Sequence, residues 1–303
     1  MRLLTRSDFD GICCAALLKE VGVIGEMVYA HPKDLQDGKI KVTGDDILAN
    51  VPYVAGCGLW FDHHSSERER LDGQDRYEGT CWPAPSTARI VYEFYGRENL
   101  ERFDEMVNAV DRVDSGQLTR EEILEPKGWV LLGLLCDPRT GLGYRRDFPV
   151  SNLDLTKQLV DLIRSQSIDQ ILGHPDVKER VDYYFASRAE FEGILRSRSR
   201  VDGPIVITDT RGVTNIPPGN RFLIYALYPE ANIDVRLIDG KQRQFVSISV
   251  GHSILNRSSS VNVGSLMLKY GGGGHHAVGT CQVPYDDAER VLAELVAAIK
   301  EQS

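Results

Sequence analysis

The sequence predicts an α/β protein with two domains: an N-terminal parallel sheet with helices on both faces, and a smaller C-terminal α/β domain. Short apolar runs that suit buried parallel strands end in titratable side chains, as in the segment 59–64 (LWFDHH). Segments with helical spacing of apolar residues separate these runs. A Ser/Arg-rich stretch followed by Asp202-Gly203-Pro204 interrupts the pattern, so we place the domain boundary near residue 200, with domains 1–200 and 201–303.

The N-terminal domain alternates strands and helices. The expected strands are 3–5, 27–32, 46–53 and 54–61. One helix is expected to begin at residue 12, and further helices are expected at 85–95, 100–113, 153–170 and 177–198. Ser86 and Thr87 supply a helix-capping signal for the second of these helices. The highly charged stretch 68–78 indicates a solvated loop, and the apolar segment 129–135 fits either a helix or a strand.

The C-terminal domain has its own pattern of short elements. The expected strands are 205–208, 233–237, 245–250 and 277–283, and the expected helices are 221–227, 261–270 and 286–300. A turn at Asp239-Gly240 joins two of the strands and favours a hairpin.

The composition is that of a soluble globular protein. The chain has 303 residues, of which 26% are charged and 42% hydrophobic, and it is long enough for two domain cores. Its first residues lack the apolar core of a signal peptide, and no apolar stretch approaches the ~20 residues that a membrane span needs. We therefore expect a cytoplasmic protein without a membrane partner.

The distribution of charge also limits the partners. The net charge is −9, most of it within residues 1–200, and no basic stripe is present. Proteins that bind long nucleic acid usually carry such a stripe, because basic residues release the counterions of the phosphate backbone. An acidic N-terminal half suits a bound cation, and a nearly neutral C-terminal half suits a short anionic substrate.

Two short motifs place acids and histidines at strand ends. Asp8 and Asp10 lie one residue apart at a strand-to-helix turn closed by Gly11. Such a turn is also a simple helix cap, but two close carboxylates are costly without a cation between them. His63 and His64 directly follow the apolar run that ends at Phe61. Side chains at the carboxyl ends of parallel strands meet at one edge of the sheet, where open α/β sheets bind ligands.

Three motifs together resemble one known family. The segments DFDG (8–11), FDHH (61–64) and YGGGGHHAVGT (270–280) are similar to motifs of the DHH phosphoesterase superfamily, in the branch with a C-terminal DHH-associated domain. The resemblance spans almost the whole chain. It implies metal-dependent hydrolysis of a phosphoester, in an active site that we expect in a cleft between the two domains.

The resemblance implies roles for individual residues of the N-terminal domain. The metal ligands it implies are Asp8, Asp10, His63 and Asp114, with Asp111 as the alternative to Asp114 and Asn50 as a weaker ligand. His64 would contact the scissile phosphate or protonate the leaving oxygen, and Asp62 would orient a histidine or touch the metal. This chain has Arg6 where the family often has a histidine, and Asn50 where the family has an aspartate. Arg6 would then contact phosphate, or the centre would hold one ion rather than two.

The C-terminal domain would bind the far end of the substrate. Its glycine run could bring backbone N–H groups close to an anion, and the histidines that follow could hydrogen-bond phosphate or stack on a base. Arg257 would pair with a terminal phosphate. The substrate-binding residues implied here are Gly272, Gly273, Gly274, His275, His276 and Arg257.

Oxygen and imidazole ligands without thiolate favour Mn²⁺, or alternatively Mg²⁺ or Co²⁺, as one or two ions. We expect hydrolysis of short oligonucleotides or linear dinucleotides of the pGpG type to mononucleotides. An exopolyphosphatase acting on inorganic polyphosphate is the alternative within the same chemistry. A degenerate relative that binds a nucleotide without cleaving it is the alternative of another class. The oligomeric state is left open, a homodimer included.

Overall fold

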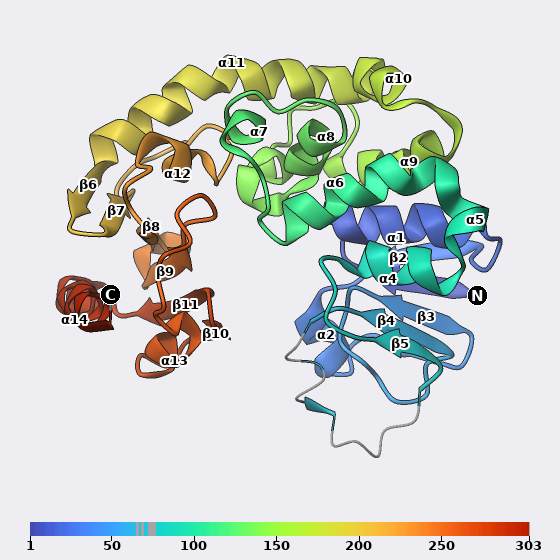
Figure 1. Cartoon of the computed structure of the whole chain (residues 1–303), viewed down its shortest axis with the longest axis horizontal. Helices are drawn as coiled ribbons and strands as arrows, with labels where there is room; N and C mark the ends of the chain where they lie inside the picture. Colours follow the sequence, from blue (N-terminus) through green and yellow to red (C-terminus); the bar gives the residue numbers. More distant parts are fainter. Residues whose placement is uncertain (65–66, 68–69, 72–76, 303) are drawn as a thin grey trace. The chain divides into compact units, whose positions relative to one another are not determined.

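The chain divides into two compact units (Figure 1). The computed structural model describes residues 1–64, 67, 70, 71 and 77–302. Unit 1 comprises Met1–Gln117 and Glu125–Phe185, and unit 2 comprises Leu118–Leu124 and Ala186–Ser303. Most of the charged stretch 68–78, predicted to be a solvated loop, lies outside the described residues. Among the helices of the described residues, none combines the length and apolar character needed to cross a bilayer.

Unit 1 is built on a five-stranded parallel sheet with the strand order β2-β1-β3-β4-β5. The strands are β1 (Arg2–Thr5), β2 (Glu26–Tyr29), β3 (Asp46–Ala49), β4 (Leu59–Asp62) and β5 (Gly79–Cys81). The chain moves outward from β1 to β2 and then returns to place β3 on the other side of β1. This reversal makes the β1/β3 junction the switch point of the sheet, where ligands bind in open α/β folds.

Both faces of this sheet are covered by helices, as the sequence predicts. Helices α1 (Phe9–Glu20) and α4 (Thr87–Phe94) contact one face, where Phe61 packs edge-on against Phe94 at a ring distance of 5.0 Å. On the other face, Leu35 of the short helix α2 (Pro32–Gln36) joins a buried cluster with Trp60. Because side chains alternate along a strand, Phe61 and Trp60 point to opposite faces.

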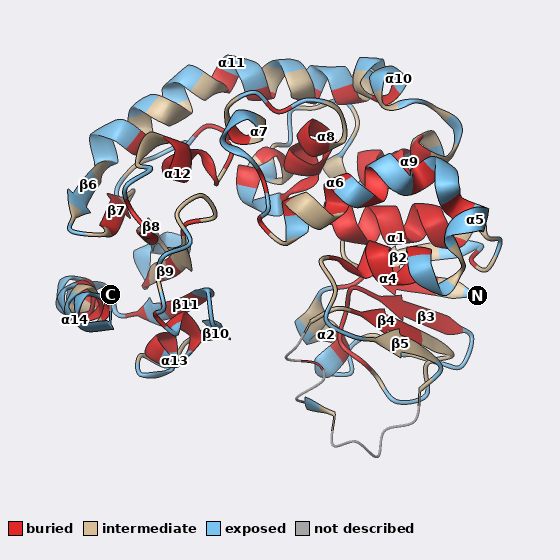
Figure 2. Cartoon of the chain, in the orientation of Figure 1, coloured by how far each residue is buried: buried red, intermediate tan, exposed pale blue. Residues whose placement is uncertain are grey.

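Helix α1 is buried on nearly all sides, and Figure 2 shows it buried along most of its length. Its residues from Phe9 to Leu18 are all buried, since the sheet lies on one side and an outer layer of helices on the other. The other helices that the structure describes here are α5 (Arg97–Leu100), α6 (Asp104–Asp114), α8 (Gly128–Cys136), α9 (Asn152–Ser165), α10 (Ile168–Gly173) and α11 (Pro175–Arg198), the last of which continues into unit 2. The segment that fitted either state, 129–135, is therefore helical.

Three predicted strands of unit 1 are shorter than the sequence suggested, since β2, expected to reach residue 32, ends at Tyr29. The apolar run 54–61 was expected to be one strand, but β4 begins only at Leu59. Gly56 has a φ of +88°, which suits a turn, and a side chain at Gly58 would lie 2.2 Å from the carbonyl oxygen of Gly44. Similarly, β3 ends at Ala49 because Asn50 adopts the left-handed conformation, with a φ of +58°.

A partly buried ion pair fixes the start of β3 to the start of β1. Both carboxylate oxygens of Asp46 accept hydrogen bonds from Arg2, at 2.7 and 3.0 Å, and one of them also accepts from the backbone N–H of Thr43. Burial opposes ionisation of Asp46, but these hydrogen bonds outweigh it and lower its pKa below the ordinary value of 3.8. The pair therefore stabilises the folded state in its ionised form.

We expect Asp46→Asn to lower the free energy of unfolding at pH 7 by about 2 kcal/mol, because hydrogen bonds to a charged group are lost. The folded-state pKa of Asp46 is depressed, so this contribution is present above its unfolded pKa and is lost as the pH falls through its folded pKa. Urea denaturation of both proteins from pH 7 to pH 3 measures it. A difference that does not shrink toward pH 3 would contradict this account.

Unit 2 is built on a six-stranded mixed sheet with the order β10-β11-β9-β8-β7-β6, in which only the β7–β8 pair is parallel. The strands are β6 (Ser199–Asp202), β7 (Ile205–Asp209), β8 (Ile233–Asp239), β9 (Val246–His252), β10 (Gly273–His275) and β11 (Val278–Val283). The helices are α7 (Arg120–Leu124), α12 (Leu223–Leu227), α13 (Val263–Leu268) and α14 (Ala288–Gln302). The predicted hairpin is present as β8–β9, whereas β6 and β10 were not foreseen.

The core of unit 2 lies between its sheet and helices α13 and α14. Leu295 and Ile299 of α14 and Met267 of α13 are fully buried against strand residues. Unit 2 therefore has an apolar core of its own.

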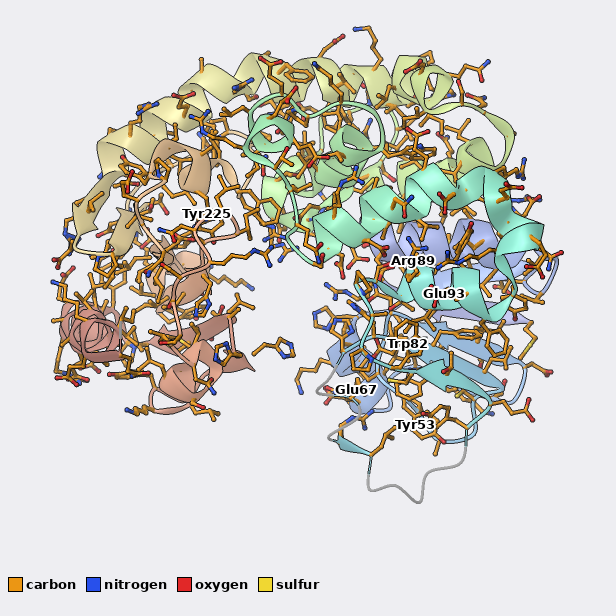
Figure 3. All side chains as sticks on the ribbon, in the orientation of Figure 1. Tyr53, Glu67, Trp82, Arg89, Glu93 and Tyr225 are labelled. Atoms are coloured by element: carbon orange, nitrogen blue, oxygen red, sulfur yellow. The ribbon has the colours of Figure 1, made fainter. Side chains whose placement is uncertain are left out.

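A small polar cluster joins α12 to β8. The hydroxyl of Tyr225 (Figure 3) donates a hydrogen bond to Asp234, and Arg236 forms an ion pair with the same carboxylate.

Candidate metal centre

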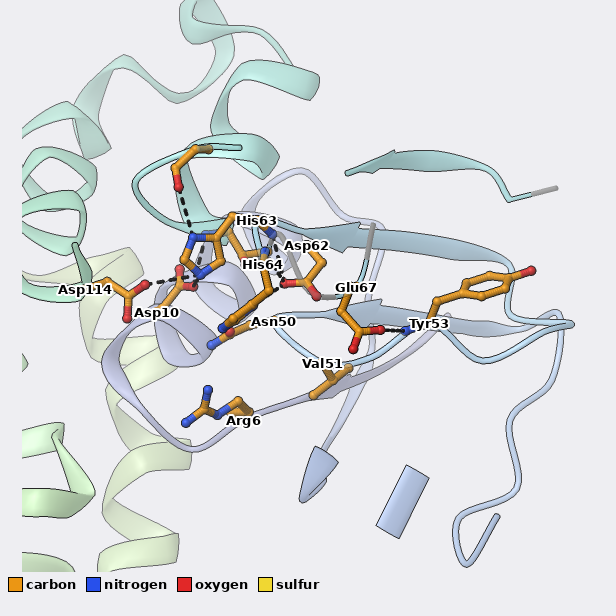
Figure 4. A network of polar contacts seen from close by, with 12 residues as sticks. Arg6, Asp10, Asn50, Val51, Tyr53, Asp62, His63, His64, Glu67 and Asp114 are labelled. Atoms are coloured by element: carbon orange, nitrogen blue, oxygen red, sulfur yellow. Dashed lines mark hydrogen bonds and ion pairs between the residues drawn. The ribbon is translucent and has the colours of Figure 1, made fainter. Parts of the chain in front are cut away.

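The acids and histidines predicted from the sequence gather at the carboxyl edge of the unit 1 sheet (Figure 4). Asp8 and Asp10 follow β1, Asn50 follows β3, and Asp62 ends β4 with His63 directly after it. These three strands are neighbours in the sheet, so their ends bring together side chains that are far apart in sequence. The site therefore lies at the switch point of the fold.

Asp10 is held by the first turn of helix α4. Its carboxylate is 2% exposed and accepts hydrogen bonds from the backbone N–H groups of Thr87, at 3.0 Å, and Ala88, at 2.7 Å. Free amide groups at a helix start attract a carboxylate, because they have no partner within the helix. Asp10 thus connects α1 to α4 and has a fixed orientation.

The ring of His63 is oriented by a backbone carbonyl group. Its Nδ1 lies 3.0 Å from the carbonyl oxygen of Ala84, which can only accept a hydrogen bond. Nδ1 therefore carries a proton, and in the neutral ring Nε2 has the lone pair. Nε2 is buried, has no hydrogen-bond partner among the described residues, and lies 3.2 Å from Asp114 and 4.0 Å from Asp10. The imidazole nitrogen and the two carboxylates could therefore bind one cation between them.

The two carboxylates lie close together in this site, and each affects the ionisation of the other. Burial and the charge of Asp114 raise the pKa of Asp10 to about 7. Asp114 is the last residue of α6, and its side chain is 33% exposed. Burial and the charge of Asp8 raise the pKa of Asp114, and the charge of His63 opposes this shift without cancelling it. A cation held by Asp10, His63 and Asp114 would remove this repulsion, and their donor atoms all lie within 4.8 Å of one another.

His64 is held by Asp62 instead. Its Nδ1 lies 2.7 Å from one carboxylate oxygen of Asp62, which is 1% exposed and also accepts from the backbone N–H of His63 at 2.8 Å. Burial lowers the pKa of His64, but the hydrogen bond and the charge of Asp62 outweigh it, so the net shift is upward. Because Nδ1 is engaged by Asp62, Nε2 is the atom of His64 left to face a substrate.

Asp8 has chain partners on both of its carboxylate oxygens. One accepts from the side-chain amide of Asn50 at 2.9 Å and from the backbone N–H of Gly11 at 3.1 Å. The other lies 3.0 Å from Nε of Arg6. Asn50 therefore presents its amide nitrogen to Asp8, and Arg6 supplies the positive charge beside it.

Asp111, the predicted alternative to Asp114, has other partners. One of its oxygens accepts from the hydroxyl of Ser86 at 2.6 Å, and the other pairs with Arg89 (Figure 3) at 2.7 Å. These bonds join α6 to the start of α4. We therefore leave Asp111 out of the proposed ligand set, because its charge is already neutralised.

A cavity of about 240 Å³ opens beside these residues. Arg6, Asn50, Asp62 and His64 contribute to its wall. The other residues that line it are Pro32, Gln36, Val51, Pro52 and Glu67. It is smaller than the ~300–1,000 Å³ of most ligand pockets, so it suits one part of a substrate, such as a phosphoryl group.

Some residues of the site were not foreseen from the sequence. The carbonyl of Ala84 and the amides of Thr87 and Ala88 act through the backbone, which leaves no mark on residue type. The Ser86-Thr87 capping signal predicts that α4 begins there, but it does not reveal that Asp10 would contact that helix start. Glu67 was missed because its buried carboxylate accepts from the backbone N–H of Tyr53, which lies fourteen residues earlier.

The glycine run in unit 2 is explained in part by close packing. The N–H groups of Gly271 and Gly272 donate to the carbonyl oxygens of Leu268 and Met267, so neither is free for an anion. A side chain at Gly272 would lie 2.2 Å from the carbonyl oxygen of Thr280, because β10 passes close to β11. Gly273 has no atom near the position of such a side chain. Substrate binding by Gly272, Gly273, Gly274, His275, His276 and Arg257 stays a prediction.

These contacts predict different effects for two neighbouring glycines. We expect Gly272→Ala to lower the free energy of unfolding by about 1–3 kcal/mol, because the added methyl group meets backbone atoms. Gly273→Ala is the matched control and should stay within about 0.5 kcal/mol of the original protein. Urea denaturation of both variants measures this. Equal stability of the two variants would mean that packing does not require Gly272.

The chain is similar to several proteins of known structure. No protein-family model and no curated protein sequence matched it. Among solved structures, it is similar to the pGpG-specific phosphodiesterase PggH from Vibrio cholerae, with 45% sequence identity, 100% of this chain and 99% of that chain covered, and a TM-score of 0.85.

Two more distant structures share the fold. The DHH domain of a member of a family of ribosomal proteins has 10% identity and a TM-score of 0.57, with 98% of this chain and 86% of that chain covered. RecJ from Thermus thermophilus, crystallised with Mn²⁺, has 12% identity and a TM-score of 0.53, with 99% of this chain and 52% of that chain covered. The full-length match at 45% identity, with Asp62-His63-His64 at the edge of the sheet, shows that the chain belongs to the DHH phosphoesterase superfamily.

Proposed function

We propose that the protein is a metal-dependent phosphodiesterase that hydrolyses linear dinucleotides of the pGpG type to mononucleotides. The observation that carries this proposal is the similarity to a pGpG-specific phosphodiesterase, which extends over the full length of both chains at 45% identity. Similarity of this extent includes the residues of unit 1 that gather at the sheet edge and the whole of unit 2. The absence of a basic stripe in the sequence supports a short substrate over long nucleic acid.

We propose that Asp10, His63 and Asp114 hold the ion, and that it is Mn²⁺. The buried Nε2 of His63, with a lone pair and without a hydrogen-bond partner among the described residues, fits this role. Two carboxylates and one imidazole suit Mn²⁺ or Mg²⁺ better than a thiophilic metal. When bound, such an ion supplies activation of water and neutralises charge on the phosphoryl group.

The other residues of the site act on the substrate directly. Asp62 holds the ring of His64 by a 2.7 Å hydrogen bond, so that Nε2 can donate to the scissile phosphate or to the leaving oxygen. Arg6 lines the cavity beside His64 and offers a positive charge to a phosphoryl oxygen. In unit 2, Arg257, His275 and His276 are exposed, and we retain them as proposed contacts to the rest of the substrate.

The test compares substrates with the purified full-length protein in the presence of Mn²⁺ and with EDTA. Separate reactions contain pGpG, pApA, pAp and inorganic polyphosphate, and chromatography follows the release of mononucleotide or phosphate. We expect GMP from pGpG in Mn²⁺ and none in EDTA. Faster release of phosphate from polyphosphate would instead identify an exopolyphosphatase. Binding of pGpG without cleavage in any divalent ion would identify a nucleotide-binding protein.

A further inference from the structure

The charges of Asp8, Asp10, Asp114 and Arg6 balance with one divalent ion. Asp10 and Asp114 are two carboxylates beside a histidine that is neutral when it is a ligand, so one divalent cation compensates them. Asp8 already has a cationic partner, because Nε of Arg6 lies 3.0 Å from its carboxylate. A second divalent ion beside Asp8 would place two further positive charges next to a guanidinium, and repulsion at such distances is strong in a partly buried site.

The side chains around Asp8 also offer few ligand atoms. A guanidinium has no lone pair for a metal and stays protonated in proteins. The side-chain amide nitrogen of Asn50 donates a hydrogen bond to Asp8 at 2.9 Å. The backbone of Asn50 is in the left-handed conformation, which sets the direction of its Cα–Cβ bond. The positive charge between the ends of β1 and β3 is therefore the guanidinium of Arg6.

We propose that the centre binds a single metal ion, at Asp10, His63 and Asp114, and that the guanidinium of Arg6 takes the place of a second ion. Nε of Arg6 neutralises Asp8, and its two terminal nitrogens make no hydrogen bond to the described part of the chain. The side chain of Arg6 is 39% exposed and lines the 240 Å³ cavity together with His64. The terminal nitrogens can therefore donate to two oxygens of the phosphoryl group that His64 contacts.

The number of bound ions rests on the proposed ligand set but does not depend on which substrate the protein cleaves, whereas the phosphoryl contact of Arg6 rests on the proposed activity. The test is therefore the number of ions bound without substrate. The metal-free protein is titrated with Mn²⁺ and monitored by the electron paramagnetic resonance signal of free Mn²⁺, and the loaded protein is analysed for metal content. We expect one Mn²⁺ per chain at saturation. Two ions per chain would overturn the proposal, whatever substrate the protein cleaves.

A double variant tests whether Arg6 and Asn50 set this number. Arg6→His with Asn50→Asp removes the guanidinium and adds two ligand side chains next to Asp8, so we expect a second Mn²⁺ to bind. Arg2→His is the matched control, because Arg2 also pairs with a buried carboxylate, that of Asp46, and this variant should still bind one ion. A double variant that folds, judged by circular dichroism, and still binds one ion would overturn the assignment to Arg6.

Kinetics test the phosphoryl contact. Arg6→Gln should keep one Mn²⁺ per chain while lowering kcat/KM for pGpG by about 10–100-fold, since a charge-assisted bidentate contact is lost. Unchanged kcat/KM in a variant that retains one ion would show that Arg6 does not bind the substrate. If the original protein cleaves none of the substrates, the proposed function fails, and the measured number of ions still decides the first part of the proposal.

Discussion

Replacing His63 with alanine is expected to abolish tight metal binding and to lower kcat/KM for pGpG by about 10³-fold or more. The ion supplies several kcal/mol of transition-state stabilisation, and each 1.36 kcal/mol corresponds to a factor of about ten in rate. Nε2 of His63 faces both Asp10 and Asp114. Removing the imidazole would leave the ion with the two carboxylates and no nitrogen ligand. Metal analysis of the purified variant and initial rates in Mn²⁺ measure the two effects.

The matched control is His174→Ala. His174 also lies in unit 1, but its imidazole is paired at 3.8 Å with Asp176 near the start of α11, and it is not among the proposed metal ligands. This variant should bind Mn²⁺ and cleave pGpG as the original protein does. If His63→Ala kept its Mn²⁺, another residue would have to supply the nitrogen ligand, and the ligand set proposed here would be wrong.

His64→Ala is expected to lower kcat for pGpG by about 10²–10⁴-fold while the Mn²⁺ content stays unchanged. This range is the usual contribution of a positioned acid or base, and His64 is not among the proposed ligands. Its hydrogen bond to Asp62 orients the ring, so the loss should appear in turnover rather than in metal binding. Single-turnover rates and metal analysis of the same preparation separate these two quantities.

The pair of variants distinguishes the two adjacent histidines. His63→Ala should lose metal and activity together, whereas His64→Ala should lose activity alone. Loss of metal from a folded His64→Ala variant would contradict this division. Equal activity of His64→Ala and the original protein would remove His64 from the reaction.

The fold of unit 1 could be predicted because its signals are local. An apolar run that ends in Asp62-His63-His64, and a capped helix start at Ser86-Thr87, depend on residues close in sequence. The shortening of β4 could not be predicted in the same way. It results from the turn at Gly56 and from Gly58, whose backbone lies against Gly44, a residue fourteen positions away in the sequence.

The candidate site could be predicted as a set of residue types but not as a network. The motifs identified Asp10, His63 and Asp114, and the structure brings them together, although their role as ligands is still a proposal. The choice between Asp114 and Asp111 could not be made from sequence, because both lie on the same face of a helix. The structure separates them through Arg89, which neutralises Asp111.

The glycine run shows a different limit of sequence reasoning. Consecutive glycines fit a loop that binds an anion, and they also fit an edge strand that lies close to its neighbour. In the structure Gly272, directly before the edge strand β10, lies close to the neighbouring strand, because a side chain there would meet Thr280. Residue type alone cannot distinguish the two, since both need the same absence of a Cβ atom.

The anchoring of Asp10 to the start of α4 has a consequence for heat denaturation. All three proposed ligands belong to unit 1, and Asp10 ties two of its helices together. An ion that binds only the native form stabilises it, by about 2.7 kcal/mol at a hundred times its dissociation constant. In a calorimeter, chelation should therefore move the melting transition of unit 1 to lower temperature while that of unit 2 stays in place, so a single melting curve would split into two.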